Sequence, residues 1–121
     1  MSNIGAELVK AIAALDASAI EACFTQDTHF RALVPPGLRE KTGATEIAKY
    51  IHGWFSDSTV LELVDSKIGG LGEKVHISYR FRGVEEGKPY LIEQQLYCVV
   101  QDGKIRKADL LCSGFVPRPA D

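Results

Sequence analysis

The stretch that decides the fold is LIEQQLYCVVQDGKIRKADLLCSGF, residues 91–115, in which two apolar-rich runs flank Asp102-Gly103. Asp-Gly between such runs favours a type I′ turn, because both central residues of that turn have positive φ. A regular two-residue hairpin then pairs Gln101 with Lys104 and Leu96 with Asp109. Residues that pair across the strands share a face. One face is therefore a mostly apolar wall with a carboxylate inside it: Ile92, Gln94, Leu96, Cys98, Val100, Ile105, Lys107, Asp109, Leu111 and Ser113.

The composition bounds the class of protein. The 121 residues suit a single domain over 1–121, and 45% hydrophobic with 25% charged residues is typical of a globular chain. A net charge of −2, with scattered Lys and Arg, argues against a nucleic-acid partner. No apolar run approaches a membrane span. The three cysteines, Cys23, Cys98 and Cys112, lie in apolar segments without CxxC spacing, which favours buried thiols and a cytoplasmic location.

Three helices are predicted in the first half of the chain. Apolar residues recur every three or four positions from Ser2 to Leu15. A short second helix follows, capped by Asp16 or Ser18. The third begins at Thr42 or Gly43 and has the largest apolar stripe, formed by Ile47, Tyr50, Ile51, Trp54 and Phe55.

Strands are predicted at 28–34, 59–68 and 74–82 and in the terminal hairpin, with loops at 38–41 and 83–89. Pro35-Pro36-Gly37 ends the first strand, because proline cannot continue a ladder. Val75, Ile77, Tyr79 and Phe81 alternate with polar residues, which indicates a sheet with one buried face. Helices followed by antiparallel strands predict an α+β fold in which the helices cover one face of a curved sheet.

Several landmarks carry a resemblance to a known family. Asp27 opens the first strand, Val34-Pro35-Pro36 closes it, Gly43 precedes the aromatic helix, and Asp102-Gly103-Lys104-Ile105 turns the last hairpin. This layout resembles the NTF2-like (cystatin-like) superfamily, which includes SnoaL-like and ketosteroid isomerase-like small domains. The resemblance implies a cone with a curved antiparallel sheet around helices, an internal apolar pocket, and often a dimer through the outer face of the sheet.

The residues at the matching positions argue against two reactions known in this superfamily. Ketosteroid isomerase carries a tyrosine and two aspartates at positions that match Ala11, Val34 and Leu96 of this sequence. Limonene epoxide hydrolase carries an arginine and two aspartates at positions that match Tyr79, Phe81 and Ser113. The sequence therefore lacks the residues on which either mechanism depends.

Asp109 is the foremost catalytic candidate. On the apolar wall its carboxylate would lose water, which would raise its pKa and suit it to proton transfer. The alternatives are a hairpin register shifted by one residue, or an ion pair with Lys107 or Arg31. His29 and Arg31 share one face of the 28–34 strand and are a candidate proton relay and oxyanion-binding group, but alternation with Phe30 directs them to solvent.

The expected function is to bind a small, largely apolar or carbonyl-bearing molecule, as a cofactor-independent isomerase, dehydratase or cyclase, or as a non-catalytic binder or dimeric interaction protein. No spacing typical of a metal site or a dinucleotide fingerprint occurs. A homodimer is expected through the second hairpin face, formed by Leu91, Tyr97, Val99, Ala108, Leu110 and Cys112. The expected ligand contacts are Arg31, Tyr50, Trp54, Tyr79, Phe81, Gln94, Leu96, Leu111 and Ser113.

Overall fold

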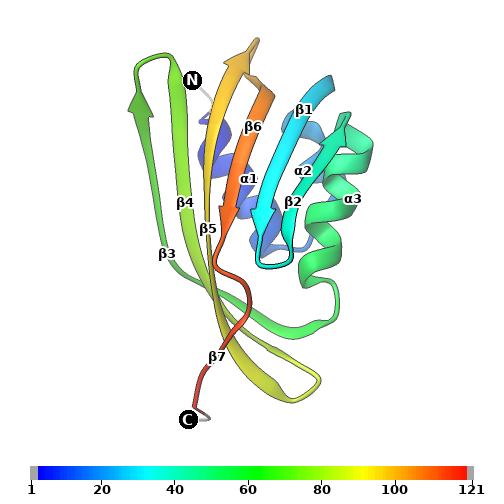
Figure 1. The fold of residues 1–121 in the computed structure, drawn as a ribbon, viewed down its shortest axis with the longest axis vertical. Coiled ribbons are helices and arrows are strands. Elements are labelled where there is room, and N and C mark those ends of the chain that lie inside the picture. Colours follow the sequence, from blue (N-terminus) through cyan, green and yellow to red (C-terminus); the bar gives the residue numbers. More distant parts are fainter. Residues whose placement is uncertain (1–2, 120–121) are drawn as a thin grey trace.

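Three helices lie against one face of a single curved sheet (Figure 1). The computed structural model describes residues 3–119. The elements are, in order, α1 Ile4–Ala13, α2 Ala17–Ala22, β1 Phe24–Val34, β2 Gly37–Thr42, α3 Ala44–Phe55, β3 Ser58–Leu71, β4 Lys74–Glu85, β5 Lys88–Gln101, β6 Lys104–Cys112 and β7 Val116–Pro117. Asn3 and Asp16 cap α1 and α2 through their side chains, which satisfies exposed N–H groups of the first helical turn. The predicted α+β class, with helices on one face of a curved sheet, is confirmed.

The sheet order is β2-β1-β6-β5-β4-β3, with the short β7 paired to β5. All neighbouring strands are antiparallel except β1 and β6, which run parallel. The sheet is therefore mixed, whereas a wholly antiparallel sheet was predicted. The Thr28 hydroxyl supports this joint by donating a 2.7 Å hydrogen bond to the carbonyl oxygen of Ile105. The sheet does not close on itself, because no strand in residues 3–119 pairs with the outer edge of β2 or β3.

The terminal hairpin turns where the sequence predicts. Asp102 and Gly103 have φ of 53° and 76°, as a type I′ turn requires, and Gln101 pairs with Lys104. A β-bulge then shifts the register, because Val100 pairs with Ile105 but Val99 pairs with Lys107, which leaves Arg106 as the extra residue. Leu96 consequently pairs with Leu110. The predicted pairing of Leu96 with Asp109 is wrong by one position.

The bulge inverts the two faces of β6. Beyond it Ala108, Leu110 and Cys112 point to the inner face, and Lys107, Asp109 and Leu111 point outward. The physical reason is the hydrophobic pattern: a regular hairpin would bury Lys107 and Asp109, whereas one extra residue buries Ala108 and Leu110. On β6 the apolar wall is therefore formed by Ala108 and Leu110. The predicted members Asp109, Leu111 and Ser113 are not part of it.

Two predicted loops are strands. Residues 37–42 form β2, a short edge strand whose side chains include Arg39, Glu40 and Lys41. Charged residues are common on edge strands, where they oppose pairing with other chains, but they hide the alternation by which strands are recognised. At 83–89, β4 and β5 continue to a tight turn at Glu86-Gly87, where φ is 52° and 75°.

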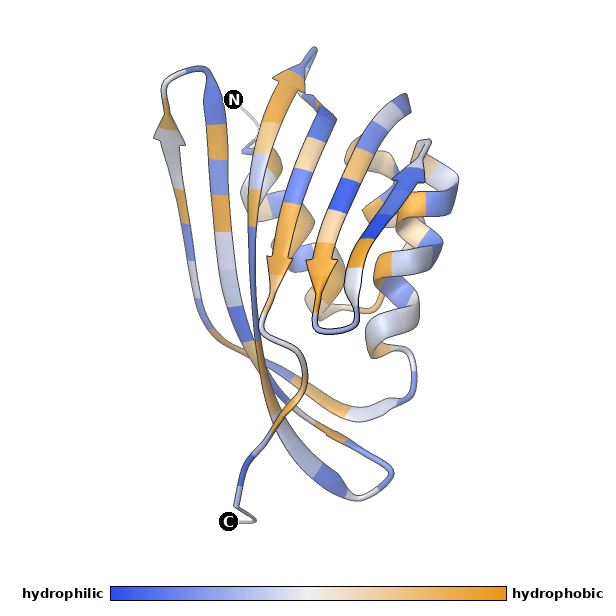
Figure 2. Cartoon of the chain, viewed as in Figure 1, coloured by the Kyte–Doolittle hydropathy of each residue, from blue (hydrophilic) through white to orange (hydrophobic). Residues whose placement is uncertain are grey.

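The core fills the inside of the cone. Hydropathy alternates along the strands in Figure 2, and the buried apolar residues of β1, β4, β5 and β6 form one core with those of the helices. Phe30, Ile77, Phe81, Leu96 and Phe55 have no exposed surface. None of the helices in residues 3–119 is long and apolar enough to cross a membrane.

Candidate functional site

A pocket opens at the end of the cone where α3, the β1–β2 hairpin and the segment after β6 meet. Its volume is about 330 Å³, at the small end of the range for ligand pockets. We call it the mouth pocket. It is lined by Val34, Pro35, Pro36, Arg39, Tyr50, Trp54, Cys112, Gly114 and Phe115.

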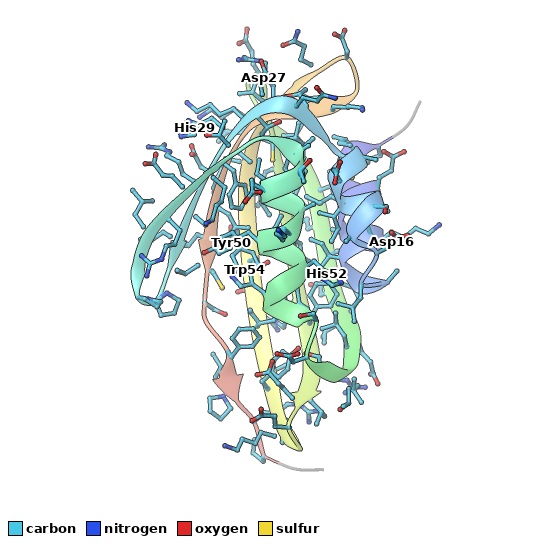
Figure 3. The ribbon with its side chains drawn as sticks, turned by 90° about the vertical axis from the view of Figure 1, so that its right-hand side faces the viewer. Asp16, Asp27, His29, Tyr50, His52 and Trp54 are labelled. Carbon is cyan, nitrogen blue, oxygen red and sulfur yellow. The ribbon has the colours of Figure 1, made fainter. Side chains whose placement is uncertain are left out.

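Each wall of the mouth pocket has a local cause. Tyr50 and Trp54 are one turn apart on α3, and Figure 3 shows both on the side of the helix that faces β1 and β2. Their ring centroids are 4.6 Å apart. Gly114 has a φ of 81° and lies so close to the Pro35 ring that an added Cβ would come within 2.7 Å of it. The close packing of Gly114 on the Pro35 ring holds the segment after β6 against the β1–β2 hairpin.

A buried chain of hydrogen bonds runs from the core to the pocket wall. The Tyr79 hydroxyl donates to Gln94 Oε1 at 2.5 Å, and Gln94 Nε2 donates to Cys112 Sγ at 3.4 Å. The Gly114 N–H also donates to this sulfur, at 3.3 Å. Burial raises the pKa of Tyr79 well above its ordinary value, so the phenol stays protonated and acts as a donor. Cys112 and Gly114 bring this hydrogen-bond chain to the pocket surface, whereas Tyr79 and Gln94 do not line the pocket.

Some predicted ligand contacts do not line the mouth pocket. Tyr79, Phe81, Gln94 and Leu96 are at most 2% exposed and fill the interior of the cone. Ser113 holds the strand end, because its hydroxyl accepts from the Glu93 N–H and donates to the Gly114 carbonyl oxygen. Leu111 is half exposed on the outer face. Tyr50 and Trp54 are the predicted contacts that the structure brings together.

Asp109 lies on the outer face of the sheet, beside β1. Its carboxylate accepts a 2.8 Å hydrogen bond from Arg31 Nε, and the two residues are partners across the β1–β6 joint. This hydrogen bond lowers the pKa of Asp109, and it outweighs the opposing effect of partial burial. Desolvation therefore does not dominate, and the expectation of a raised pKa on an apolar wall is wrong. Asp109 and Arg31 form a structural ion pair.

A carbon-detected NMR titration of Asp109 should give an apparent pKa below the roughly 3.9 of a free aspartate. Because the pKa is lower in the folded state, the pair stabilises the protein above the unfolded pKa, and this contribution disappears as the pH falls through the folded value. Both side chains are partly exposed, so the effect on stability is screened and small. The variant Arg31→Gln should move the pKa back up, and an unchanged pKa would contradict this assignment.

His29 also lies outside the site. Its Nε2 is 3.2 Å from Glu40 Oε1 on the neighbouring β2, and both side chains are about half exposed. Figure 3 shows His29 and Asp27 above Tyr50 and Trp54, toward the end of the molecule at which α3 begins. Alternation along β1 buries Phe30 and Ala32 and turns His29 and Arg31 to the outer face. The proposed roles of His29 and Arg31 in the pocket have no support in this arrangement.

Most residues of the pocket wall have no recognisable signal in the sequence. Arg39 lies in a stretch predicted to be a loop, and a regular hairpin register places Cys112 on the outer face. The break in alternation at Arg106-Lys107 was the available signal for the bulge, because two successive charged residues cannot both avoid the core in a regular strand. Phe115 gave no signal, since it follows the last long strand in an irregular segment.

Two larger hollows lie elsewhere on the surface. One, of about 490 Å³, is formed by the β4–β5 turn and the end of the described chain, and includes Glu85, Glu86 and Lys88. The other, of about 400 Å³, lies between α1 and α2 and includes Glu7, Lys10 and Asp16. Both mix charges of opposite sign, whereas the mouth pocket combines aromatic walls with a single cation.

Comparison with known proteins supports the description of the fold. A family model for a SnoaL-like domain matches residues 6–108. No curated protein matches the chain. A hypothetical protein from Catenulispora acidiphila with a ketosteroid isomerase-like fold, solved in complex with trimethylamine, has a TM-score of 0.74 at 15% identity and covers 91% of this chain and 85% of its own.

Two further solved structures are similar. A protein from Xanthomonas campestris that is proposed to be a polyketide cyclase has a TM-score of 0.72 at 19% identity, over 89% of this chain and 86% of its own. An epoxide hydrolase of M. tuberculosis similar to limonene epoxide hydrolase has a TM-score of 0.69 at 14% identity, over 91% and 80%. At these identities the likeness concerns the fold alone.

Proposed function

The chain belongs to the SnoaL-like domain family, and from that premise we propose that its mouth pocket binds a small, largely apolar molecule. The observation that carries the proposal is the pocket itself, whose walls are the rings of Tyr50, Trp54 and Phe115 and the prolines of the hairpin turn. Such a site gains binding energy by removing apolar ligand surface from water. The site lies where α3 meets the open end of the sheet.

Trp54 provides the readout for a binding test, because it is the one tryptophan in the sequence and it lines the pocket. Titration with 1-adamantanemethanol, a compact apolar alcohol that does not absorb near 280 nm, should change the Trp54 emission in a saturable way. The variant Val34→Phe should fill the pocket and abolish binding. The control Val60→Phe adds the same bulk on exposed β3 and should bind as the parent does. Equal binding by both variants would remove the mouth pocket as the site.

A cofactor-independent isomerase, dehydratase or cyclase is the second candidate. The Tyr79–Gln94–Cys112 chain supports it, because it brings a thiol with two N–H donors to the pocket wall. Within residues 3–119 no Asp or Glu lines the mouth pocket, so this chemistry would not use a carboxylate from that range. The simplest step to detect is proton abstraction next to a carbonyl group.

Exchange of deuterium into 4-tert-butylcyclohexanone, followed by NMR in deuterated buffer, tests the catalytic candidate without knowledge of a product. The protein should accelerate exchange, and Cys112→Ala should reduce the acceleration while Cys98→Ala, a buried thiol outside the pocket, should not. Binding of the ketone without accelerated exchange would leave the chain as a binder.

We also propose a symmetric homodimer through the outer face of the sheet. The bulge changes which residues form this outer face, because Ala108 and Leu110, which were predicted to lie on it, are buried inside the cone. The exposed apolar side chains beside the Arg31–Asp109 pair are Leu33, Tyr97 and Leu111, which are 50%, 39% and 50% exposed. A second copy would cover them, as interfaces of closed symmetric dimers do.

Sedimentation equilibrium at micromolar concentration should give the mass of a dimer. Leu111→Glu should shift the equilibrium to monomer, because it places a carboxylate among the exposed apolar side chains of the outer face. The control Val64→Glu makes the same change at another exposed position, on edge strand β3, and should leave the dimer intact. A monomer for the unmodified protein would remove the proposal.

A cytoplasmic location is proposed on the basis of the cysteines. Cys23, Cys98 and Cys112 form no disulfide, and the first two are buried. Burial raises the pKa of Cys23 to about 11 and that of Cys98 to about 12, so both stay as unreactive thiols. Recovery of the protein in a periplasmic or secreted fraction would contradict this location.

A further inference from the structure

We propose that the molecule taken by the mouth pocket is an organic anion, a compact apolar body with a carboxylate group that Arg39 binds at the rim. The inference rests on the proposed function of the pocket and narrows its ligand class. Its basis is the placement of charge around the pocket, which follows from the register of β2.

The register of β2 places Arg39 on the inner face. Arg39 pairs with Ala32 and Lys41 pairs with Phe30, and both partners on β1 are fully buried beneath α3. Because paired residues share a face, Arg39 and Lys41 are directed toward α3. The acid between them, Glu40, falls on the other face, where it meets His29. Alternation thus separates the charges of β2, with its two cations inside and its acid outside.

The Arg39 guanidinium is available to a ligand. Its Nη1 donates a 3.1 Å hydrogen bond to the Leu38 carbonyl oxygen, and it forms no ion pair with any residue in the range 3–119. A guanidinium has five N–H donors, and this hydrogen bond uses one of them, so the other donors can bind a ligand. Arg31, Arg80 and Arg82 each have a carboxylate partner on the sheet. Arg39 therefore differs from these arginines in facing an apolar pocket whose described lining contains no acid.

Lys41 adds to the positive potential at the same wall. Its Nζ lies 5.0 Å from the centroid of the Tyr50 ring, which forms part of the pocket. The ammonium group is held by the ring face and leaves Arg39 as the nearer donor for a ligand in the pocket. Aromatic walls with a planar, five-donor cation at the rim are complementary to an apolar body that carries a planar anion.

The test uses three adamantane probes of nearly equal shape: 1-adamantanecarboxylate, 1-adamantanemethanol and 1-adamantanemethylamine, which is a cation at neutral pH. Binding is followed by Trp54 emission and by calorimetry. The carboxylate should bind about tenfold more tightly than the alcohol, because a charge-assisted bidentate hydrogen bond is stronger than a neutral one, and the exposed rim weakens this gain. The amine should bind more weakly than the alcohol. Added salt should weaken binding of the carboxylate and leave the alcohol nearly unaffected.

Two variants assign the preference to Arg39. In Arg39→Gln the ratio of carboxylate to alcohol affinity should fall close to one, while saturable binding of the alcohol persists and shows that the pocket is still formed. Arg106→Gln is the matched control, because it removes the same charge from the exposed bulge on β6, outside the pocket lining. It should keep the parent ratio.

The outcomes separate the inference from the function on which it rests. Equal affinity for the carboxylate and the alcohol, tighter binding of the amine, or a ratio that survives Arg39→Gln would each overturn the anion-binding role while leaving an apolar pocket in place. Failure of all three probes to bind at millimolar concentration would overturn both the pocket function and its ligand class.

Discussion

Shortening Phe55 to alanine is expected to lower the free energy of unfolding by about 3–5 kcal/mol, the usual cost of removing a large aromatic core side chain. Phe55 has no exposed surface, and its ring contacts Phe81 and Phe115 with centroids 5.6 Å and 6.2 Å away. It therefore joins α3 to both β4 and the segment that closes the mouth pocket. Ile51→Ala, one turn earlier on the same buried stripe, should cost about 2–5 kcal/mol.

Urea denaturation followed by far-ultraviolet circular dichroism measures both values. Val64→Ala on exposed β3 is the control and should change stability by less than about 0.5 kcal/mol. Changes below about 1 kcal/mol for both core variants would mean that α3 does not fill the cone. The Phe55 variant should also weaken binding of the adamantane probes, since Phe115 would lose one of its supports.

Gly83→Ala is expected to destabilise the protein by about 1–3 kcal/mol or more, although it adds one methyl group. Gly83 on β4 pairs with Tyr90 on β5, and the Tyr90 ring lies directly over the glycine. An added Cβ would clash with the Tyr90 hydroxyl and would come within 2.7 Å of the Val60 carbonyl oxygen. The backbone oxygen cannot move without disturbing β3, and moving Tyr90 would break its 2.6 Å hydrogen bond to Ser58.

The matched control is Gly69→Ala on β3, where an added Cβ meets no heavy atom within 4 Å. This variant should be neutral or slightly stabilising, because alanine reduces the freedom of the unfolded chain. Denaturation curves for the two alanine variants would show the difference directly. Similar stability for both would mean that the ring of Tyr90 is not seated over Gly83 in solution.

The sequence predicted the helices and the turns better than the faces of the strands. The stripe that includes Ile47, Ile51 and Phe55 and the Asp102-Gly103 turn are local signals, and both were confirmed. The bulge at Arg106 depends on which register buries more apolar surface in three dimensions, so a regular hairpin placed Asp109 on the wrong side. One inserted residue therefore changed a catalytic candidate into half of an ion pair.

The pocket was harder to predict because its walls come from distant segments. Tyr50 and Trp54 lie on a helix whose inward face is visible in the sequence, and they were identified. Arg39 comes from a charged edge strand, and Phe115 from an irregular segment, and neither carries a periodic pattern. The partners that bring them to Tyr50 are set by sheet order, which no single stretch of sequence encodes.

The parallel joint between β1 and β6 also governs when this protein can fold. Its bonds connect residues about eighty positions apart, as between the Cys23 carbonyl oxygen and the Ile105 N–H, so the entropy of closing a long loop must be overcome before they form. During synthesis β1 and β2 are made before β6, so the parallel joint cannot form until β6 has been added. The mouth pocket needs Gly114 and Phe115 as well, so it can be completed only after β6 has been synthesised.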